Sequence, residues 1–264
     1  MTRYRKKTLS GAVCEIEVYN VPERRSFKLK PAPEKIRTAE ERAEYNRKKS
    51  EKHFVRLVNT NYTHNDYFVT ATYSDDKLPG TYDEADHNLN NYIRRLRRTN
   101  PYARIMGVTG YGRRSGRLHH HLIISGISES DIIGKWNDGD IIRAKKLRES
   151  NYYNGIDCGE DFTALAIYLH SHTPDNVKGR RWRQTKTIQQ PIEEKPTEIK
   201  RVYSESKPPK APEGFMYIPQ AFQTNEYYGS GYMRFKYVRI TEPKLDINRF
   251  KNRAENKKSA VLNC

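Results

Sequence analysis

The chain has 264 residues and a net charge of +17, from 49 lysines and arginines against 32 aspartates and glutamates. It is long enough for one large domain, or one domain with extensions, and its charge indicates a polyanionic partner. No segment approaches the roughly 20 apolar residues of a membrane span. The first residues lack the apolar core of a signal peptide, and the 3 cysteines are too widely spaced for a disulfide framework or a cysteine-type zinc site, so we expect a protein of a reducing cytoplasm.

The first predicted elements are a strand and a long helix. Residues 1–32 are expected to be basic and irregular, with one strand candidate at residues 13–19. A helix is predicted to begin at Thr38, which forms a capping-box pattern with Glu41, and to end near Asn59. The charged first half of this helix is either a solvated face or a surface that lies along DNA.

The middle of the chain alternates predicted strands and helices. Apolar and β-branched runs predict strands at residues 66–74, 102–109, 117–124 and 141–142. Helical spacing of apolar side chains predicts helices that begin at Asp83, Ser128 and Asp161. Residues 110–116 are rich in glycine and arginine, and we expect a hairpin loop there. The arginines at the end of the second helix are favourable for the helix dipole alone and need not contact DNA.

The last part of the chain changes in composition. Beyond Pro191 glutamate, lysine and proline dominate through about Pro212, which indicates either a solvated linker or an arm that crosses the surface. Strand character returns at residues 215–218 and 232–240, with a turn at 229–231, and a basic tail begins at Lys244. These elements predict an α+β fold: a central antiparallel sheet with the histidine-rich strand in the middle, helices packed on one side, and basic N- and C-terminal extensions.

The segment 117–124, with the sequence RLHHHLII, is the most informative part of the chain. In an extended strand His119 and His121 lie on one face and His120 on the other. Two imidazoles on one face form a preorganised pair of nitrogen ligands for a divalent metal, although a bare His-x-His pattern also occurs in half-exposed strands that bind nothing. A register slip would leave His120 facing the site alone, but the leucines at 118 and 122 favour the pairing of His119 with His121.

Three blocks follow one another in the order of a known family: the strand at 68–73, the histidine strand at 116–124, and the helix with Tyr168 at 165–169. Through them the chain resembles the rolling-circle replication initiators of the HUH endonuclease superfamily, specifically those of phages and plasmids of Gram-positive hosts. Residues 136–139 and 179–182 support the likeness, and a fainter one extends over residues 208–237. It implies an endonuclease core at residues 61–190, between an N-terminal extension with a helix (1–60) and a segment with an arm, strands and a basic tail (191–264).

The resemblance implies a metal-dependent, site-specific endonuclease and strand transferase in the cytoplasm of a bacterial host cell. Such enzymes cleave single-stranded origin DNA through a covalent 5′-phosphotyrosine and start rolling-circle replication of a phage or plasmid. Tyr168 matches the nucleophile, and Tyr152 and Tyr153 lie too far upstream to be its partners. A phenol, with an ordinary pKa of about 10, is a poor nucleophile, and Mg²⁺ or Mn²⁺ on His119 and His121 would polarise the phosphate. A host helicase is a candidate partner, and the oligomeric state stays open.

Two positions depart from the family pattern. The acid that commonly serves as a third metal ligand on the preceding strand is replaced by Gly110, so that ligand must be water, Thr109 or an acid from elsewhere. The lysine that commonly follows the tyrosine by three residues is replaced by Ser171. His172, four residues after Tyr168, shares its helix face and could meet the phosphate or the metal, which makes it a candidate catalytic residue.

Arg113, Arg114 and Arg117 are candidate phosphate contacts near the DNA entry, although an exposed basic hairpin without a specific role explains them equally well. His170 is expected to point away from Tyr168 and to have no role in the site. Three other functions stay open. They are a catalytically weak or inactive origin-binding relative, a relaxase or transposase of the same superfamily, and a general single-strand or RNA-binding protein without an active site.

Overall fold

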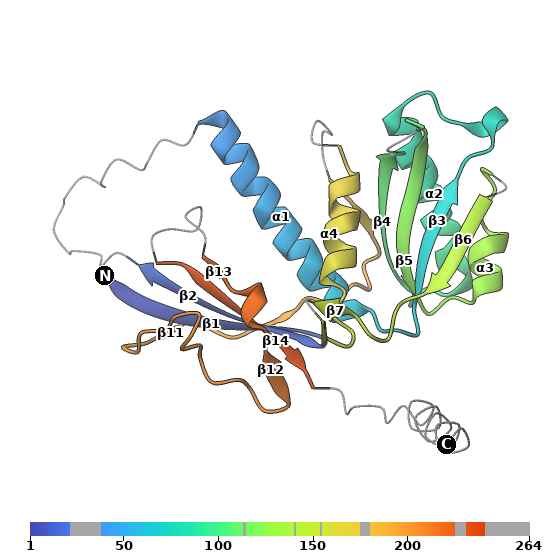
Figure 1. Cartoon of the computed structure of the whole chain (residues 1–264). Helices are drawn as coiled ribbons and strands as arrows, with labels where there is room; N and C mark the ends of the chain where they lie inside the picture. Colours follow the sequence, from blue (N-terminus) through green and yellow to red (C-terminus); the bar gives the residue numbers. More distant parts are fainter. Residues whose placement is uncertain are drawn as a thin grey trace, which may run out of the picture.

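The structure, a computed structural model, describes residues 1–21, 38–112, 115–139, 141–153, 155–174, 180–224 and 231–240. In these residues the chain forms an α+β fold with two large antiparallel sheets, a small hairpin and four α-helices (Figure 1). No helix in the described part of the chain is long and apolar enough to cross a membrane.

The first sheet contains the histidine strand at its centre. Its strands run in the order β6-β3-β5-β4-β9 and every neighbouring pair is antiparallel. Their bounds are β3 (Tyr67–Thr72), β4 (Arg104–Tyr111), β5 (Leu118–Ser125), β6 (Ile141–Lys146) and β9 (Arg183–Gln184). We call this sheet the histidine sheet. The predicted central position of the histidine strand is confirmed.

Helices cover both faces of the histidine sheet, not one face as expected. On one face α2 (Tyr82–Thr99) and α3 (Glu129–Gly134) bury a core with Leu89, Leu122 and Ile124. On the other face α1 (Ala39–Asn61) and α4 (Thr163–His172) bury a second core with Phe54, Ile123 and Ala166. Alternation along β5 makes this possible, because its even-numbered residues face α2 and its odd-numbered residues face α4.

The second sheet joins the two ends of the described chain, and we call it the terminal sheet. Its strand order is β10-β1-β2-β14-β12, with β11 beside β1 and β13 beside β14. The bounds are β1 (Thr2–Ser10), β2 (Val13–Val21), β10 (Ile192–Glu193), β11 (Thr197–Glu198), β12 (Phe215–Tyr217), β13 (Gln223–Thr224) and β14 (Met233–Arg239). The first and third parts of the predicted three-part division thus share one sheet.

Two expectations change in this second sheet. The prediction that the first residues are irregular is wrong for Thr2–Ser10, which pair with β2 along the whole strand. The stretch after Pro191 is an arm and not a free linker, because β10 and β11 both pair with β1. The predicted turn residues Gly229 and Ser230 and the tail from Lys244 lie outside the described residues.

Most helix starts follow their predicted caps. Thr38 and Glu41 form the capping box of α1, and Thr81 and Glu84 form a second one that starts α2 at Tyr82. Short elements complete the fold: the 3-10 helices η1 (Asp75–Lys77) and η2 (Pro219–Ala221), and the hairpin β7 (Tyr152–Tyr153) with β8 (Ile156–Asp157). Gly110, expected in a loop, lies inside β4.

Candidate active site

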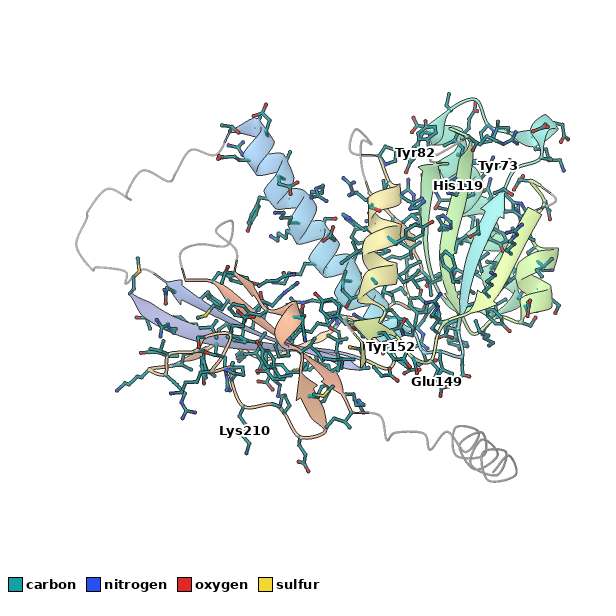
Figure 2. The ribbon with its side chains drawn as sticks, viewed as in Figure 1. Tyr73, Tyr82, His119, Glu149, Tyr152 and Lys210 are labelled. Carbon is teal, nitrogen blue, oxygen red and sulfur yellow. The ribbon has the colours of Figure 1, made fainter. Side chains whose placement is uncertain are left out.

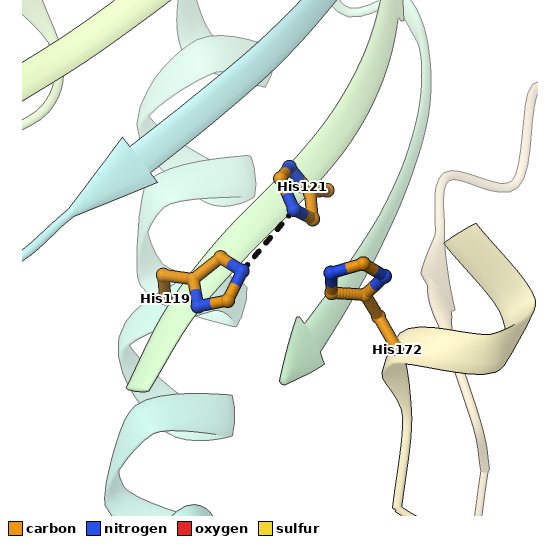
Figure 3. A group of neighbouring side chains, drawn as sticks. All are labelled: His119, His121 and His172. Carbon is orange, nitrogen blue, oxygen red and sulfur yellow. Dashed lines mark hydrogen bonds between the residues drawn. The ribbon is translucent and has the colours of Figure 1, made fainter. Parts of the chain in front are cut away.

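His119 and His121 lie side by side on the face of β5 that looks toward α4. Their Nε2 atoms are 3.1 Å apart, and the rings meet edge to face with centroids 4.8 Å apart (Figure 3). The neighbouring strands fix this register, because His119 is paired with Thr72 of β3 and Gly110 of β4. The alternative register, with His120 alone facing the site, is wrong in this structure.

A third histidine reaches the pair from the end of α4. The His172 ring lies 4.6 Å from that of His121 and 5.5 Å from that of His119, measured between centroids. One ring nitrogen from each of the three residues lies within 4.8 Å of the others. The sequence predicts His172 for this site from its spacing to Tyr168, and the structure places it beside the strand pair, as Figure 3 shows.

Hydrogen bonds hold the outer nitrogens of the three rings. The Nδ1 of His119 donates to the carbonyl oxygen of Arg117 at 3.3 Å, and the Nδ1 of His172 donates to that of Tyr168 at 3.0 Å. Since carbonyls only accept, Nε2 in both rings keeps an unprotonated lone pair. The Nδ1 of His121 lies 3.1 Å from the Thr70 hydroxyl, which can take either role. Outer hydrogen bonds of this kind orient histidines that bind metals.

The Tyr168 hydroxyl lies at the open edge of the histidine cluster. It is 3.4 Å from Nε2 of His121, and the Tyr168 and His172 rings are 4.3 Å apart between centroids. The residue is 46% exposed, so its hydroxyl can reach both the cluster and solvent. Ser171, at the position of the family's lysine, donates to the Tyr168 carbonyl at 2.8 Å and belongs to the helix end.

Gly110 lies under the end of α4, directly opposite His119 in the sheet. A Cβ added there would lie 2.5 Å from the carbonyl oxygen of His172, so a side chain cannot enter without moving the helix end. The space that an acid at position 110 would need is therefore filled by the His172 backbone, and the His172 ring approaches the strand pair instead. None of the options considered from the sequence for a third ligand includes this packing.

Burial keeps the strand histidines neutral. Burial, with the neighbouring histidines, lowers the pKa of His121 to about 3, and burial also lowers the pKa of His119. Neutral imidazoles are the form that binds metal ions, so both rings are ready as ligands at physiological pH.

The other two histidines of these segments are core residues. His120 is fully buried on the opposite face, where its ring nitrogens lie 2.5 Å from the Tyr73 hydroxyl and 3.0 Å from the Thr109 hydroxyl. Thr109 is therefore engaged away from the site. His170 is 1% exposed and lies 3.1 Å from the Ser50 hydroxyl, which agrees with its predicted direction away from Tyr168.

The predicted DNA-contacting arginines are only partly described. Arg117 forms an ion pair with Asp75 and donates to the Tyr73 carbonyl, beside the strand that carries His119. Arg113 and Arg114 lie outside the described residues. Figure 2 places Tyr152 at the far end of the histidine sheet from His119, which agrees with its predicted exclusion as a second nucleophile.

Residues 66–173 match the model of a family of replication-associated proteins, the ORF2 family. The match covers less than half of the chain, but it contains Tyr168 and all three clustered histidines, and it leaves out the terminal sheet. No curated protein and no solved structure gives a match. The match indicates a replication-associated protein, which fits the net charge of +17.

Proposed function

We propose that the protein is a metal-dependent, single-tyrosine endonuclease and strand transferase. It would nick and rejoin single-stranded DNA at a replication origin and so initiate rolling-circle replication of a phage or plasmid. The observation that carries this proposal is the Tyr168 hydroxyl beside three converging histidines, within the segment that matches a replication-associated family.

The donor set fits a divalent metal ion. His119, His121 and His172 offer three nitrogens from two elements, and the Nε2 separation of 3.1 Å in the strand pair suits adjacent ligands of one ion. Mg²⁺ or Mn²⁺ bound there would polarise the scissile phosphate and stabilise the leaving oxygen. The half-exposed site leaves room for phosphate oxygens, which Mg²⁺ in particular needs.

The residues of the chain carry out the covalent step. The Tyr168 oxygen forms a bond to phosphorus while the bond from phosphorus to the 3′-oxygen breaks. The phenol loses its proton to solvent, to which the exposed hydroxyl is open, and the 3′-oxygen gains one. Because the phosphotyrosine keeps the bond energy, a returning 3′-hydroxyl reverses the step and rejoins the strand. Arg117 would contact a nearby phosphate, and a host helicase would separate the duplex ahead.

The alternative of an inactive binding protein was motivated by the missing acid at Gly110. His172 supplies a nitrogen at that place, which removes this motive and supports an enzyme. The family match also favours replication over conjugative transfer or transposition, although those use the same chemistry.

The test uses a labelled single-stranded origin oligonucleotide with Mn²⁺, wild-type protein and Tyr168→Phe. We expect a covalent protein–DNA adduct on a denaturing gel for the wild type, and none with EDTA or with Tyr168→Phe. Tyr153→Phe is the matched control, because Tyr153 is also exposed but lies in β7, and it should form the adduct normally. If Tyr168→Phe still forms the adduct, the assignment of the nucleophile is wrong.

A further inference from the structure

A wedge-shaped cleft separates α1 from the terminal sheet. The two meet near the C-terminal end of the helix and diverge toward its N-terminal end (Figure 1). Two adjoining hollows, of about 560 and 430 Å³, line the wedge and share Lys52 and Tyr232. Each is within the size range of ligand sites, and together they form a continuous path along the helix.

The cleft is basic. Among the residues that line the two hollows, lysine and arginine outnumber glutamate by eight to four. The glutamates on its floor are already neutralised, because Glu15 and Glu17 both pair with Arg56 of α1. Lys49 is exposed on the rim, and no ion pair is recorded for it among the described residues. The pairs near the rim, such as Lys48 with Glu44, are weak surface pairs that a phosphate can displace.

Aromatic side chains accompany these cations. Tyr19 of the terminal sheet and Tyr45 of α1 line the same hollow as Lys49, from opposite walls. Tyr19 also stacks on Tyr4 of the neighbouring strand, with ring centroids 6.3 Å apart. A groove that combines cations with tyrosines suits unpaired nucleotides, because phosphates meet the charges while bases stack on the rings.

The cleft continues to the helix that carries the nucleophile. Thr163 and Ile167 of α4 line the larger hollow, and Ile167 is 41% exposed. Ile167 directly precedes Tyr168, so the outer ridge of α4 separates the cleft from the histidine cluster. A DNA strand that leaves Tyr168 across this ridge enters the cleft.

We propose that the cleft between α1 and the terminal sheet holds a single-stranded DNA segment next to the strand bound at Tyr168. This inference rests on the proposed function, since it takes the substrate to be DNA. It also selects one of the two alternatives for the charged half of α1, namely that this helix lies along DNA.

The test compares wild type, Lys49→Glu and Tyr45→Ala in fluorescence anisotropy with short and long oligo(dT), of about 6 and 25 nucleotides. Arg98→Glu is the control, because it makes the same charge change at an exposed site on α2, across the histidine sheet. We expect Lys49→Glu to weaken binding of the long strand about tenfold and to reduce its salt slope by about 1. Tyr45→Ala should weaken it severalfold, whereas Arg98→Glu should resemble the wild type.

Two further measurements separate the possible failures. Equal thermal midpoints would show that the variants are folded, and iodouracil in the long strand should cross-link to Tyr45 or Tyr19 in the wild type. If Lys49→Glu and Tyr45→Ala bind the long strand as the wild type does, or if poly-glutamate competes as well as DNA, the cleft is not a DNA site. If the cleft variants lose long-strand binding but the wild type forms no origin adduct, the endonuclease proposal fails while the cleft site stands.

Discussion

A glycine decides where the third histidine of the site can lie. Because the carbonyl of His172 fills the space above Gly110, the two departures from the family pattern are one arrangement and not two separate losses. The position that lacks a side chain makes room for the helix end, and the helix end brings a ring. Positions 110 and 172 should therefore change together or not at all.

Replacing Gly110 with alanine should displace the end of α4. The added Cβ meets backbone, which cannot give way as a flexible side chain would, so the ring and the tyrosine both shift. We expect Gly110→Ala to lower Mn²⁺ affinity in calorimetry, and the adduct rate, by about tenfold or more, since about 1 Å of misplacement costs that much. Gly134→Ala, where a Cβ meets open space, is the control. An unchanged Mn²⁺ affinity in Gly110→Ala would contradict this account of the packing.

Three imidazoles should also set the metal preference. Nitrogen ligands suit Mn²⁺ and later transition metals better than Mg²⁺, which prefers oxygen. We expect Mn²⁺ to support adduct formation at a lower concentration than Mg²⁺, and His172→Ala to lower Mn²⁺ affinity tenfold or more. A titration of adduct yield against each metal measures both effects. Half-maximal Mg²⁺ and Mn²⁺ concentrations that are equal would show that oxygen ligands dominate the site.

The buried His120 should make the fold sensitive to acid. Burial, followed by the charge of His119, lowers the pKa of His120 to about 3, below the ordinary value of about 6.5. The unfolded chain therefore binds a proton that the folded chain refuses. Stability from this group is complete above pH 6.5 and is lost toward pH 3, by up to about 1.4 kcal/mol per pH unit. Urea unfolding between pH 6.5 and 4.5 should show a shallower loss for His120→Gln, and an equal slope would contradict it.

At the scale of elements, α1 connects the two sheets through buried charge. The Arg56 guanidinium donates to Glu15 at 2.6 Å and to Glu17 at 2.7 Å. Burial alone would raise the pKa of Glu17, but Lys52 and Arg56 hold it at about 2. Such pairs are poor sources of net stability, but breaking one strands a charge. They therefore fix the angle between the helix and the terminal sheet.

Arg56→Met should leave two buried carboxylates without their main partner. We expect a loss of about 3–5 kcal/mol in the free energy of unfolding, measured with urea. Arg47→Met removes a half-exposed pair with Glu44 one helix region earlier and should cost at most about 1 kcal/mol. Equal losses in the two variants would mean that the Arg56 cluster does not hold the sheets together.

The elements that sequence predicts well are those whose signal is local. Capping residues such as Thr38 and the alternation around His119 and His121 depend only on neighbours in the chain, and both predictions are confirmed. Strand β1 was missed because its cleft-facing residues are polar and most of its other face is basic, so no apolar stripe marks it. Gly110 reads as a turn signal, yet it serves a close approach by α4.

The site was predicted in its parts but not in its closure. Tyr168 and the three histidines follow from spacing and resemblance, whereas the contact of Thr70 with His121 depends on strand pairing that sequence does not give. The packing of α4 on Gly110 likewise depends on tertiary structure. The division at residues 60 and 190 stays a prediction.

At the scale of the whole molecule, charge and chemistry should be separable. The net charge of +17 is spread over the chain, whereas the covalent step needs one hydroxyl. We expect Tyr168→Phe to bind oligo(dT) with the wild-type salt slope while it forms no adduct, because a phenol contributes nothing to counterion release. Anisotropy from 50 to 200 mM NaCl measures the slope, and a slope that changes by 1 or more would show that the substitution disturbs the basic surface.

The pairing of the two chain ends has a consequence for synthesis on the ribosome. Strands β1 and β2 emerge first, but their partners β10 and β14 begin at Ile192 and Met233. Residues 66–173, with the whole histidine cluster, emerge before either partner, so the nascent chain can complete this cluster while the first hairpin still waits. The wedge beside α1 therefore forms last, and a ribosome that stalls before Met233 would release a chain with its histidine site but without its cleft.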